Sequence, residues 1–152
     1  MTDKLPAITI KPIGIVRNEA KEVTPLDSRD WGKIVSEIVI DSRLTAALDG
    51  LDEFSHIVVL FWMHKVTEIK VPLKVHPRGK KDLPLVGLFA TRAPNRPNRI
   101  GKTTVRLLER HGNILKVKGL DALDGSPVFD IKPYIPRDDL LGAKVPPWIT
   151  KK

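Results

Sequence analysis

Proline and glycine are distributed along the whole of this 152-residue chain, and they constrain its fold more than any other feature. The 13 prolines and 10 glycines leave few uninterrupted stretches in which a long α-helix could form. Proline lacks the N–H that the inner turns of a helix donate, and glycine loses much conformational freedom when a helix forms. We therefore expect mainly short strands joined by turns.

Several apolar segments bounded by turn residues predict these strands. Residues 33–40 alternate, so that Ile34, Ser36, Ile38 and Ile40 share one face. Residues 57–63 are continuously apolar, which predicts a central strand buried on both faces. Proline interrupts the segment 8–16, which we expect at an edge or a bulge. The other expected strands are residues 85–90, 103–108, 114–119 and 128–131.

One short helix is expected at residues 43–48, where Asp41 or Ser42 can cap its start and Gly50 can end it. The glycine and asparagine within residues 110–113 favour a hairpin turn. No glycine-rich dinucleotide or P-loop motif is present. Many short strands with one short helix are typical of a small antiparallel β-barrel, a mainly β fold without a Rossmann sheet.

The length is that of one domain, which can bury a core without disulfides. We expect a barrel domain at residues 1–140 and a C-terminal tail at residues 141–152. The start of the chain has no apolar signal core and no segment is long and apolar enough to span a membrane, so we expect a cytoplasmic protein. Without cysteine, and with four widely spaced histidines, the chain predicts no metal site.

The basic excess of the chain is confined to one segment. The formal net charge is +8, from 26 Lys and Arg against 18 Asp and Glu. Residues 74–106 hold nine of the basic side chains and a single acid, Asp82, so they account for the whole excess. Such a stripe attracts polyanions, although a solvated basic face is an equally frequent cause of the pattern.

The most informative part of this stripe is residues 87–101. Arg92, Arg96 and Arg99 follow an expected strand and are interspersed with two prolines and two asparagines. A stiff loop loses little entropy on binding, and a guanidinium group matches the geometry of phosphate or carboxylate. The segment predicts a preorganised anion or nucleotide clamp. The alternative is a proline-rich connector with solvated arginines.

A second cluster holds three aspartates, Asp121, Asp124 and Asp130. Asp124 precedes a glycine, and an aspartate in such a turn often bonds its own backbone. The other two lie at the end of one expected strand and inside another, where a carboxylate needs a partner. The basic stripe, and especially Arg92, could supply it.

His64 and Lys65 directly follow the apolar segment 57–63. Polar residues at the exit of a buried strand often line a site at the rim of a barrel. A single histidine at such a position is more often structural than catalytic, and both interpretations stay open from the residues alone.

Four motifs connect these segments to a known family: Gly-Leu-Phe-Ala-Thr-Arg from residue 87, Arg-Pro-Asn from residue 96, Asp-Gly-Ser-Pro-Val from residue 124 and Asp-Ile-Lys-Pro-Tyr from residue 130. Through them the chain resembles the TsaA-like (TrmO) family of S-adenosylmethionine-dependent tRNA methyltransferases, over residues 8–140. The resemblance implies a small β-barrel, a homodimer, and a cofactor bound at the barrel rim beside the dimer interface. It also implies methylation of N6 of threonylcarbamoyladenosine, next to the anticodon of tRNA.

The resemblance further implies which residues form the site. The family's cofactor contacts carry over onto His64, Lys65, Arg92, Lys118, Gly119, Leu120 and Asp121, and less directly onto Lys102. The bacterial Pro-Arg-Gln loop is replaced by residues 26–33, where Trp31 or Gly32 is expected nearest the cofactor. The residues expected to hold the tRNA are Lys80, Lys81, Arg96, Asn98 and Arg99, the last in place of a proline found in many members.

The reaction implied is an in-line displacement at the sulfonium methyl, with Asp121 or His64 accepting the N6 proton. Asp121 is equally suited to bind the amino group of the cofactor, and Arg92 to orient a carboxylate. Two alternatives are the same cofactor fold acting on another substrate and a non-enzymatic RNA-binding barrel. RNA-binding barrels usually stack bases on exposed aromatic rings. Only 5% of this chain is aromatic, and most of these residues lie in apolar runs expected to be core.

Overall fold

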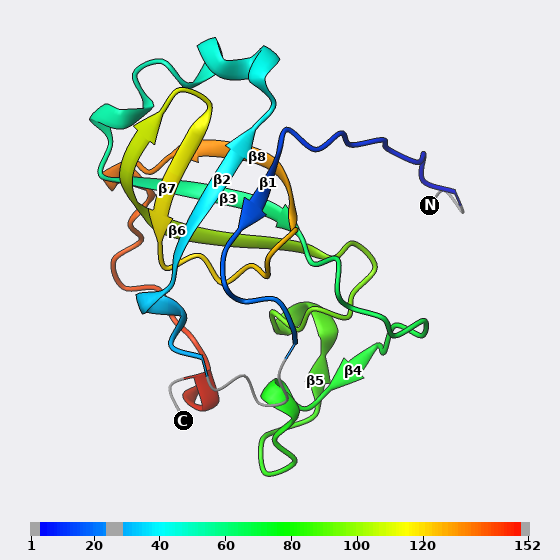
Figure 1. Cartoon of the computed structure of the whole chain (residues 1–152). Helices are drawn as coiled ribbons and strands as arrows, with labels where there is room; N and C mark the ends of the chain where they lie inside the picture. The colour runs from blue at the N-terminus through cyan, green and yellow to red at the C-terminus, as the bar shows by residue number, and fades with distance from the viewer. Residues whose placement is uncertain (1–3, 24–28, 150–152) are drawn as a thin grey trace.

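The computed structural model describes residues 4–23 and 29–149, and its centre is a closed antiparallel β-barrel (Figure 1). Its strands follow the order β1-β2-β7-β6-β3-β8, and β8 pairs with β1 to close it. The mainly β, non-Rossmann barrel expected from the sequence is confirmed. The barrel strands are β1 (Gly14–Arg17), β2 (Val35–Ile40), β3 (His56–Trp62), β6 (Ile100–His111), β7 (Ile114–Lys118) and β8 (Pro127–Pro133).

Between β3 and β6 the chain leaves the barrel and forms a lobe, residues 66–99, which projects from one end of the barrel (Figure 1). Two short strands, β4 (Lys74–Val75) and β5 (Val86–Gly87), pair within the lobe. The remaining elements are the 3-10 helices η1 (Trp31–Lys33), η2 (Ser42–Leu48), η3 (Leu51–Glu53), η4 (Pro77–Gly79), η5 (Leu88–Ala90), η6 (Pro136–Asp138) and η7 (Pro147–Ile149).

The expected helix at residues 43–48 is η2, which has 3-10 rather than α geometry. Asp41 caps it, because its side chain accepts a hydrogen bond from the backbone N of Arg43 at 3.0 Å. The Arg43 side chain also donates to this carboxylate and is the main reason that the pKa of Asp41 falls to about 2. Gly50 then adopts φ +86 and redirects the chain into η3.

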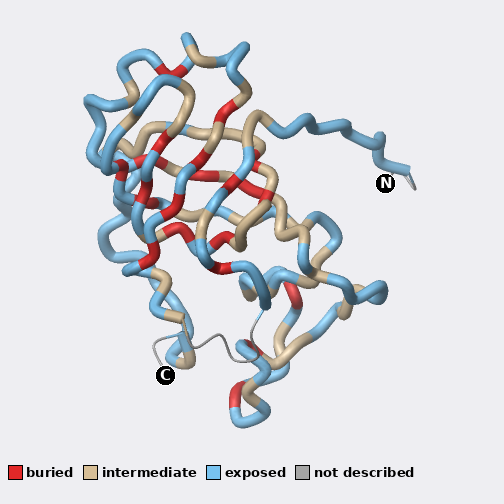
Figure 2. Tube along the Cα trace, in the orientation of Figure 1, coloured by how far each residue is buried: buried red, intermediate tan, exposed pale blue. Residues whose placement is uncertain are grey.

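The interior of the barrel holds the core (Figure 2). In β2 the alternation predicted from the sequence is confirmed, since Ser36, Ile38 and Ile40 are all buried. The prediction that residues 57–63 are buried on both faces was wrong. Inward residues of β3 such as Ile57 are buried, whereas Leu60 and its outward neighbours are half-buried. A closed barrel has one interior, so only one face of each strand points into the core.

Two further strand predictions were too long. Within residues 8–16 backbone pairing begins only at Ile13, whose N–H donates to the carbonyl of Val128, and β1 itself begins at Gly14. Residues 4–12 form an exposed N-terminal arm that leads away from the barrel (Figure 1). Pro12 has no N–H to donate, which ends the ladder there. Within residues 85–90 only two residues pair, because the partner strand β4 is equally short, and the chain then turns into η5.

Most aromatic residues lie outside the core, which corrects the expectation from the sequence. Phe61 is the one buried aromatic side chain among the described residues, at 3% exposure. Phe54 and Phe89 are exposed, and the others are half-buried. Exposed aromatic rings are therefore available for stacking on this protein.

The C-terminal segment follows β8 and η6 along the outside of the molecule. Its described residues 141–149 are exposed apart from Trp148, whose carbonyl accepts a hydrogen bond from Arg78 in the lobe at 3.2 Å. Residues 150–152 of the expected tail, and residues 26–28 of the expected cofactor loop, lie outside the described residues. No helix in the described part of the chain is long and apolar enough to cross a membrane.

Candidate active site

A cavity of about 550 Å³ opens where the lobe joins the barrel. This volume lies within the range of small-molecule sites in proteins. Its wall is formed by the end of β3, the start of the lobe, the loop that carries Arg92, Arg96 and Arg99, and the segment between β7 and β8. Its lining includes Trp31, Phe61, Met63, His64, Lys65, Val66, Glu68, Ala93, Asp121, Ala122, Leu123 and Ser126.

The floor of this cavity is part of the hydrophobic core. Phe61 and Ala122 line the cavity and also belong to the buried core cluster, at 3% and 1% exposure. The polar groups stand around this apolar floor, so a ligand can place an apolar body inside and charged groups at the mouth. Four residues expected at the cofactor, His64, Lys65, Trp31 and Asp121, line this one cavity.

His64 lies two residues beyond the end of β3, and its ring is held by a buried serine. Nδ1 of His64 lies 3.3 Å from Oγ of Ser126, which is 2% exposed. Ser126 Oγ donates its only hydrogen to the carbonyl of Leu123 at 2.7 Å, so it accepts from Nδ1–H of the histidine. In this tautomer Nε2 carries the lone pair and can accept a proton.

The surroundings of His64 also favour the neutral form of its ring, because they lower its pKa. Burial lowers the pKa of His64, and the charge of neighbouring Lys65 lowers it further, whereas Asp124 opposes them. Gly125 adopts φ +85, and a β-carbon there would lie 3.5 Å from Nε2. Glycine therefore serves the backbone turn and places no side chain of its own against Nε2.

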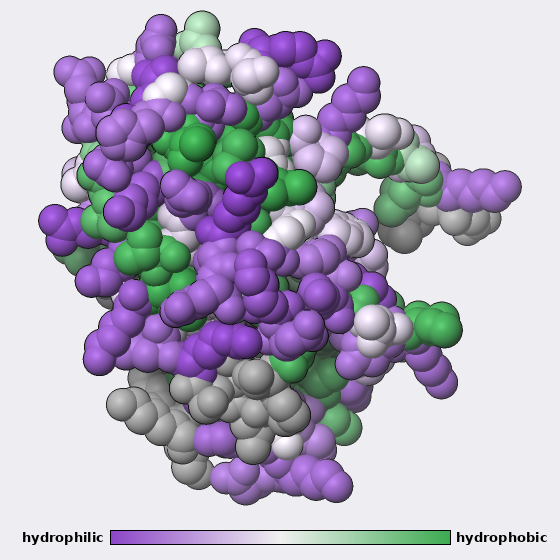
Figure 3. Space-filling view, in the orientation of Figure 1, coloured by the Kyte–Doolittle hydropathy of each residue, from purple (hydrophilic) through white to green (hydrophobic). Residues whose placement is uncertain are grey.

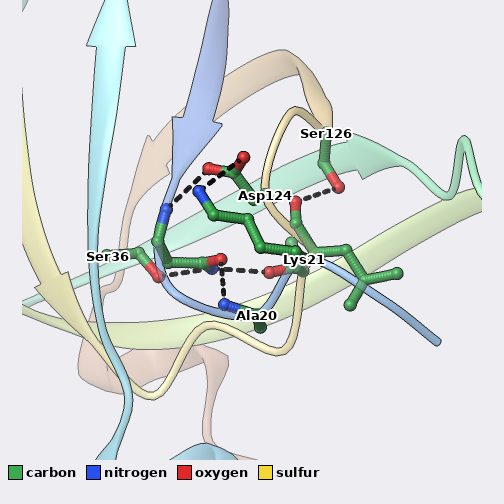
Figure 4. Close-up of polar contacts among 8 residues, drawn as sticks. Ala20, Lys21, Ser36, Asp124 and Ser126 are labelled. Carbon is green, nitrogen blue, oxygen red and sulfur yellow. Dashed lines mark hydrogen bonds and ion pairs between the residues drawn. The ribbon is translucent and has the colours of Figure 1, made fainter. Parts of the chain in front are cut away.

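Asp124 fixes the loop that carries Ser126 (Figure 4). Its Oδ1 accepts from the backbone N of Asn18 at 2.9 Å, and its Oδ2 pairs with Nζ of Lys21 at 2.9 Å. The hydrogen bond from Lys21 is the largest cause of a lowered pKa at Asp124. Asp124 thus accepts from the distant backbone N–H of Asn18 and not from the backbone of its own turn. Nδ2 of Asn18 extends the network to Ser36 Oγ at 2.9 Å.

Asp121 is exposed at the cavity mouth and accepts a short hydrogen bond from Thr103 of β6. Asp130, in β8, pairs with Lys132 at 3.1 Å and does not line this cavity. The expectation that Arg92 would partner these carboxylates was therefore wrong. No group of three or more His, Asp or Glu side chains in the described ranges could hold a metal ion.

Two of the three loop arginines bind the backbone of the chain itself. Nη1 and Nη2 of Arg99 donate to the carbonyls of Val66 and Glu68, each at 2.5 Å. Arg96 donates to the carbonyls of Thr91 and Ala93 at 3.1 and 3.0 Å. These bonds tie the loop to the cavity wall, because Val66, Glu68 and Ala93 all line it.

The other expected site residues lie outside the cavity lining. Arg92 is exposed on the lobe, and Lys102 lies on β6 opposite Leu60 of β3. Lys118 ends β7, Gly119 adopts φ +96 and Leu120 is fully buried in the core, so this segment positions the aspartate that follows it. Lys80 and Lys81 follow η4, Gly32 lies in η1, and Asn98 lies beside the N-terminal arm.

Sequence reasoning did not single out Ser126, although the residue stands in a quoted motif. Its contact with His64 joins residues 62 positions apart, and no local pattern reports such a distance. Membership of the Asp-Gly-Ser-Pro-Val motif was the one available signal.

Comparisons with known proteins agree with this architecture. The model of the tRNA-methyltransferase O N-terminal domain family matches residues 17–140. A protein of Methanothermobacter thermautotrophicus named "Probable S-adenosyl-L-methionine-binding protein" is 51% identical over 138 residues, which cover 89% of this chain and 96% of the relative. A mouse protein named "tRNA (adenine(37)-N6)-methyltransferase" is 45% identical over 92 residues, 59% of this chain and 20% of that protein.

The crystal structure of TrmO from Pseudomonas aeruginosa is similar to this chain with a TM-score of 0.73 and 30% identity, over 91% of this chain. The chain spans 62% of that solved chain. The family match covers most of the chain, from within β1 to beyond η6. The protein therefore belongs to the family of the tRNA-methyltransferase O N-terminal domain.

Proposed function

We propose that this protein is an S-adenosylmethionine-dependent methyltransferase that acts on N6 of threonylcarbamoyladenosine next to the anticodon of tRNA. The observation that carries the proposal is the cavity at the lobe, where a histidine with an available Nε2 lies among groups suited to the cofactor. Family membership and the names of the relatives support the cofactor and the substrate class.

The cavity fits the chemistry of S-adenosylmethionine. An apolar floor and the indole of Trp31 suit the adenosine part, and Lys65 suits the carboxylate of the amino acid part. The carboxylate of Asp121 suits its ammonium group. When bound, the cofactor supplies an electrophilic methyl group on a positively charged sulfur. Leu120 and Gly119 contribute by fixing the backbone from which Asp121 projects.

His64 is the better of the two candidate bases. N6 of the modified adenine must lose its proton as the N–C bond forms and the S–C bond to the methyl group breaks, which leaves the demethylated cofactor as a neutral thioether. Nε2 of His64 is unprotonated in this tautomer and can take up that proton. Asp121 is exposed and already accepts from Thr103, which favours a role in binding. The residues of the chain thus orient the two reactants, exclude water at the floor and take up one proton.

The lobe supports the choice of a nucleic acid as substrate. Residues 66–99 contain eight basic and two acidic side chains, and Lys80, Lys81 and Arg92 lie among them. Hydrophilic side chains cover much of the face shown in Figure 3, around the junction of lobe and barrel. Such a surface binds phosphate through Coulombic attraction and counterion release. Arg96 and Arg99 contribute charge, while their donors hold the loop.

The proposal includes a homodimer. The exposed N-terminal arm carries Leu5 and Ile8, which are 84% and 83% exposed. Together with Trp62 and Phe129 on the outer barrel wall, the arm lines an open, mainly apolar recess of about 1010 Å³. A second copy of the chain would remove this surface from water. Sedimentation of the full chain and of a variant lacking residues 4–12 tests this, and a monomer at all concentrations would contradict it.

The proposed reaction is tested on tRNA. Nucleosides of tRNA from a strain that lacks this protein should lose the methyl group on N6 of threonylcarbamoyladenosine, as measured by mass spectrometry. His64→Ala should lower kcat in vitro by about 10²–10⁴-fold. Unchanged methylation in the strain would remove tRNA as the substrate and favour the same cofactor fold acting elsewhere.

Calorimetry distinguishes an enzyme from a barrel that only binds RNA. An RNA-binding module should not bind S-adenosylmethionine, whereas the proposed enzyme should, with weaker binding in Lys65→Ala and Asp121→Ala. Arg106→Ala, on the outer face of β6, is a matched control that removes a charge without touching the cavity.

A further inference from the structure

Phe89 is an aromatic ring displayed to solvent by an ordered piece of backbone. Its side chain is 78% exposed, whereas rings of this size are usually buried in a core or an interface. It lies in η5 next to Leu88, which is 4% exposed. The carbonyl of Leu88 accepts hydrogen bonds from both the backbone N and Oγ1 of Thr91, at 3.0 and 2.7 Å. The local fold therefore holds the ring outward.

One side of the ring is occupied by an arginine that is itself held in place. The guanidinium carbon of Arg96 lies 5.8 Å from the centroid of the Phe89 ring, within the range of a cation–π contact. The carbonyls of Thr91 and Ala93 fix that guanidinium. The ring is thus oriented from one side, and its exposure leaves area for a second flat partner.

The surroundings of Phe89 select the kind of partner. The lobe has eight basic and two acidic residues, so an anionic partner is favoured over a second copy of this basic chain. Bases of single-stranded RNA stack on exposed aromatic rings and on guanidinium planes, while their phosphates bind Lys and Arg. The platform also adjoins the candidate active site, because Ala93, which holds Arg96, lines the cavity.

We propose that Phe89, backed by Arg96, is a stacking platform for an unpaired RNA base that neighbours the nucleotide held in the cavity. The proposal rests on the proposed function and adds a base-binding site outside the cavity. A base stacked there would give the lobe a preference for unpaired loops over paired stems, since a paired base has no free face to offer.

The test measures affinity of the full chain for two RNAs, a stem–loop with an anticodon-like unpaired loop and a duplex of equal length. Phe89→Ala should bind the stem–loop about 5- to 100-fold more weakly and the duplex unchanged. Phe89→Trp should retain binding, and Phe89→Leu, which keeps apolar bulk without a π face, should resemble alanine. Phe54→Ala is the matched control, because Phe54 is also exposed but lies beside η3, outside the lobe.

Salt dependence separates stacking from charge. Phe89→Ala removes no cation, so the slope of log affinity against log salt concentration should equal that of the unaltered chain, whereas Lys80→Gln should reduce it. Calorimetry with S-adenosylmethionine should give the same cofactor affinity for Phe89→Ala and the unaltered chain.

Three outcomes would overturn the platform. The first is equal stem–loop affinity of Phe89→Ala and the unaltered chain with cofactor binding intact, which would overturn the platform and leave the proposed function standing. The second outcome is that Phe89→Ala loses affinity for anionic phosphatidylserine vesicles, Phe89→Leu retains it, and RNA affinity does not change. That result would assign the ring, with the exposed Ile69 and Leu73, to a membrane surface. Absence of stem–loop binding by the unaltered chain would overturn the proposed function and the platform together.

Discussion

Ser126 and His64 form a hydrogen bond whose direction is set by a third group. The hydroxyl of Ser126 is committed as a donor to the carbonyl of Leu123 at 2.7 Å, so it can only accept from Nδ1 of His64 at 3.3 Å. Through this serine, a backbone carbonyl determines which ring nitrogen holds the proton. The loop between β7 and β8 therefore decides both the position and the tautomer of the histidine.

Replacement of Ser126 by alanine should therefore change chemistry more than binding. We expect kcat to fall about tenfold or more, with little change in KM for the cofactor, because Nε2 is no longer the favoured acceptor. The ¹⁵N resonances of the His64 ring should show a mixture of tautomers. Ser36→Ala controls for loss of a buried hydroxyl from the same hydrogen-bond network, since Ser36 bonds Asn18 rather than His64. A similar loss of kcat in both variants would mean that Ser126 is only structural.

The rate should depend on pH through His64. Its pKa is lowered from 6.5, mainly by burial, so the active neutral form persists below pH 6.5. The acid limb of the kcat/KM profile should fall below that value. Lys65→Gln should raise the His64 pKa seen by NMR, and Asp124→Asn should lower it. An acid limb above pH 6.5 would argue against His64.

The same lowered pKa has a consequence for folding. As the pH falls, the unfolded chain binds a proton at His64 before the folded chain does. The contribution of this group to the free energy of unfolding is therefore complete above pH 6.5 and declines as the pH falls towards the folded pKa.

The Asp124 network should appear in stability measurements. Asp124→Ala leaves the backbone N of Asn18 without its partner and should lower the free energy of unfolding by about 1–2 kcal/mol at pH 7. The pKa of Asp124 is lowered from 3.8, so the difference should shrink as the pH falls through its folded pKa. Asp49→Ala removes an exposed carboxylate that pairs with Arg110, and it should cost less than about 1 kcal/mol in the same urea titration.

Gly101 controls the packing of the cavity floor. A β-carbon at this position would lie 2.4 Å from Cζ of Phe61, so Gly101→Ala must displace that ring. We expect a loss of about 1–3 kcal/mol in stability and weaker cofactor binding. Gly87→Ala should stay within about 0.5 kcal/mol, because nothing lies within 4 Å of the added carbon. Equal effects of the two substitutions on stability would mean that the Phe61 ring moves without a cost in free energy.

The sequence predicted the barrel where local pattern determines burial. Alternation in β2 and the turn between β6 and β7 depend on neighbouring residues, and both predictions were confirmed. The segments 8–16 and 85–90 were overestimated because apolar character does not show whether a partner strand exists. The exposure of Phe89 shows the same limit, since an apolar run alone does not specify which side chains face inward.

The candidate site could be predicted only in part for a related reason. His64 and Lys65 were expected at the rim because they end an apolar strand, and both line the cavity. The contact of Ser126 with His64 spans 62 residues, and the carbonyl partners of Arg99 lie more than 30 residues away. The type of a residue indicates that it needs a hydrogen-bond partner, but the identity of that partner depends on how the barrel closes.

Phe61 and Ala122 belong at once to the core of the barrel and to the floor of the cavity. Any ligand that seats on this floor therefore adds its binding free energy to the stability of the barrel, and the melting temperature should rise with ligand concentration. The coupling also restricts how the protein can diverge: a substitution that improves packing beneath the ligand changes the shape on which the ligand rests. Thermal stability and cofactor binding in this protein are for that reason coupled, and a substitution in the floor changes both.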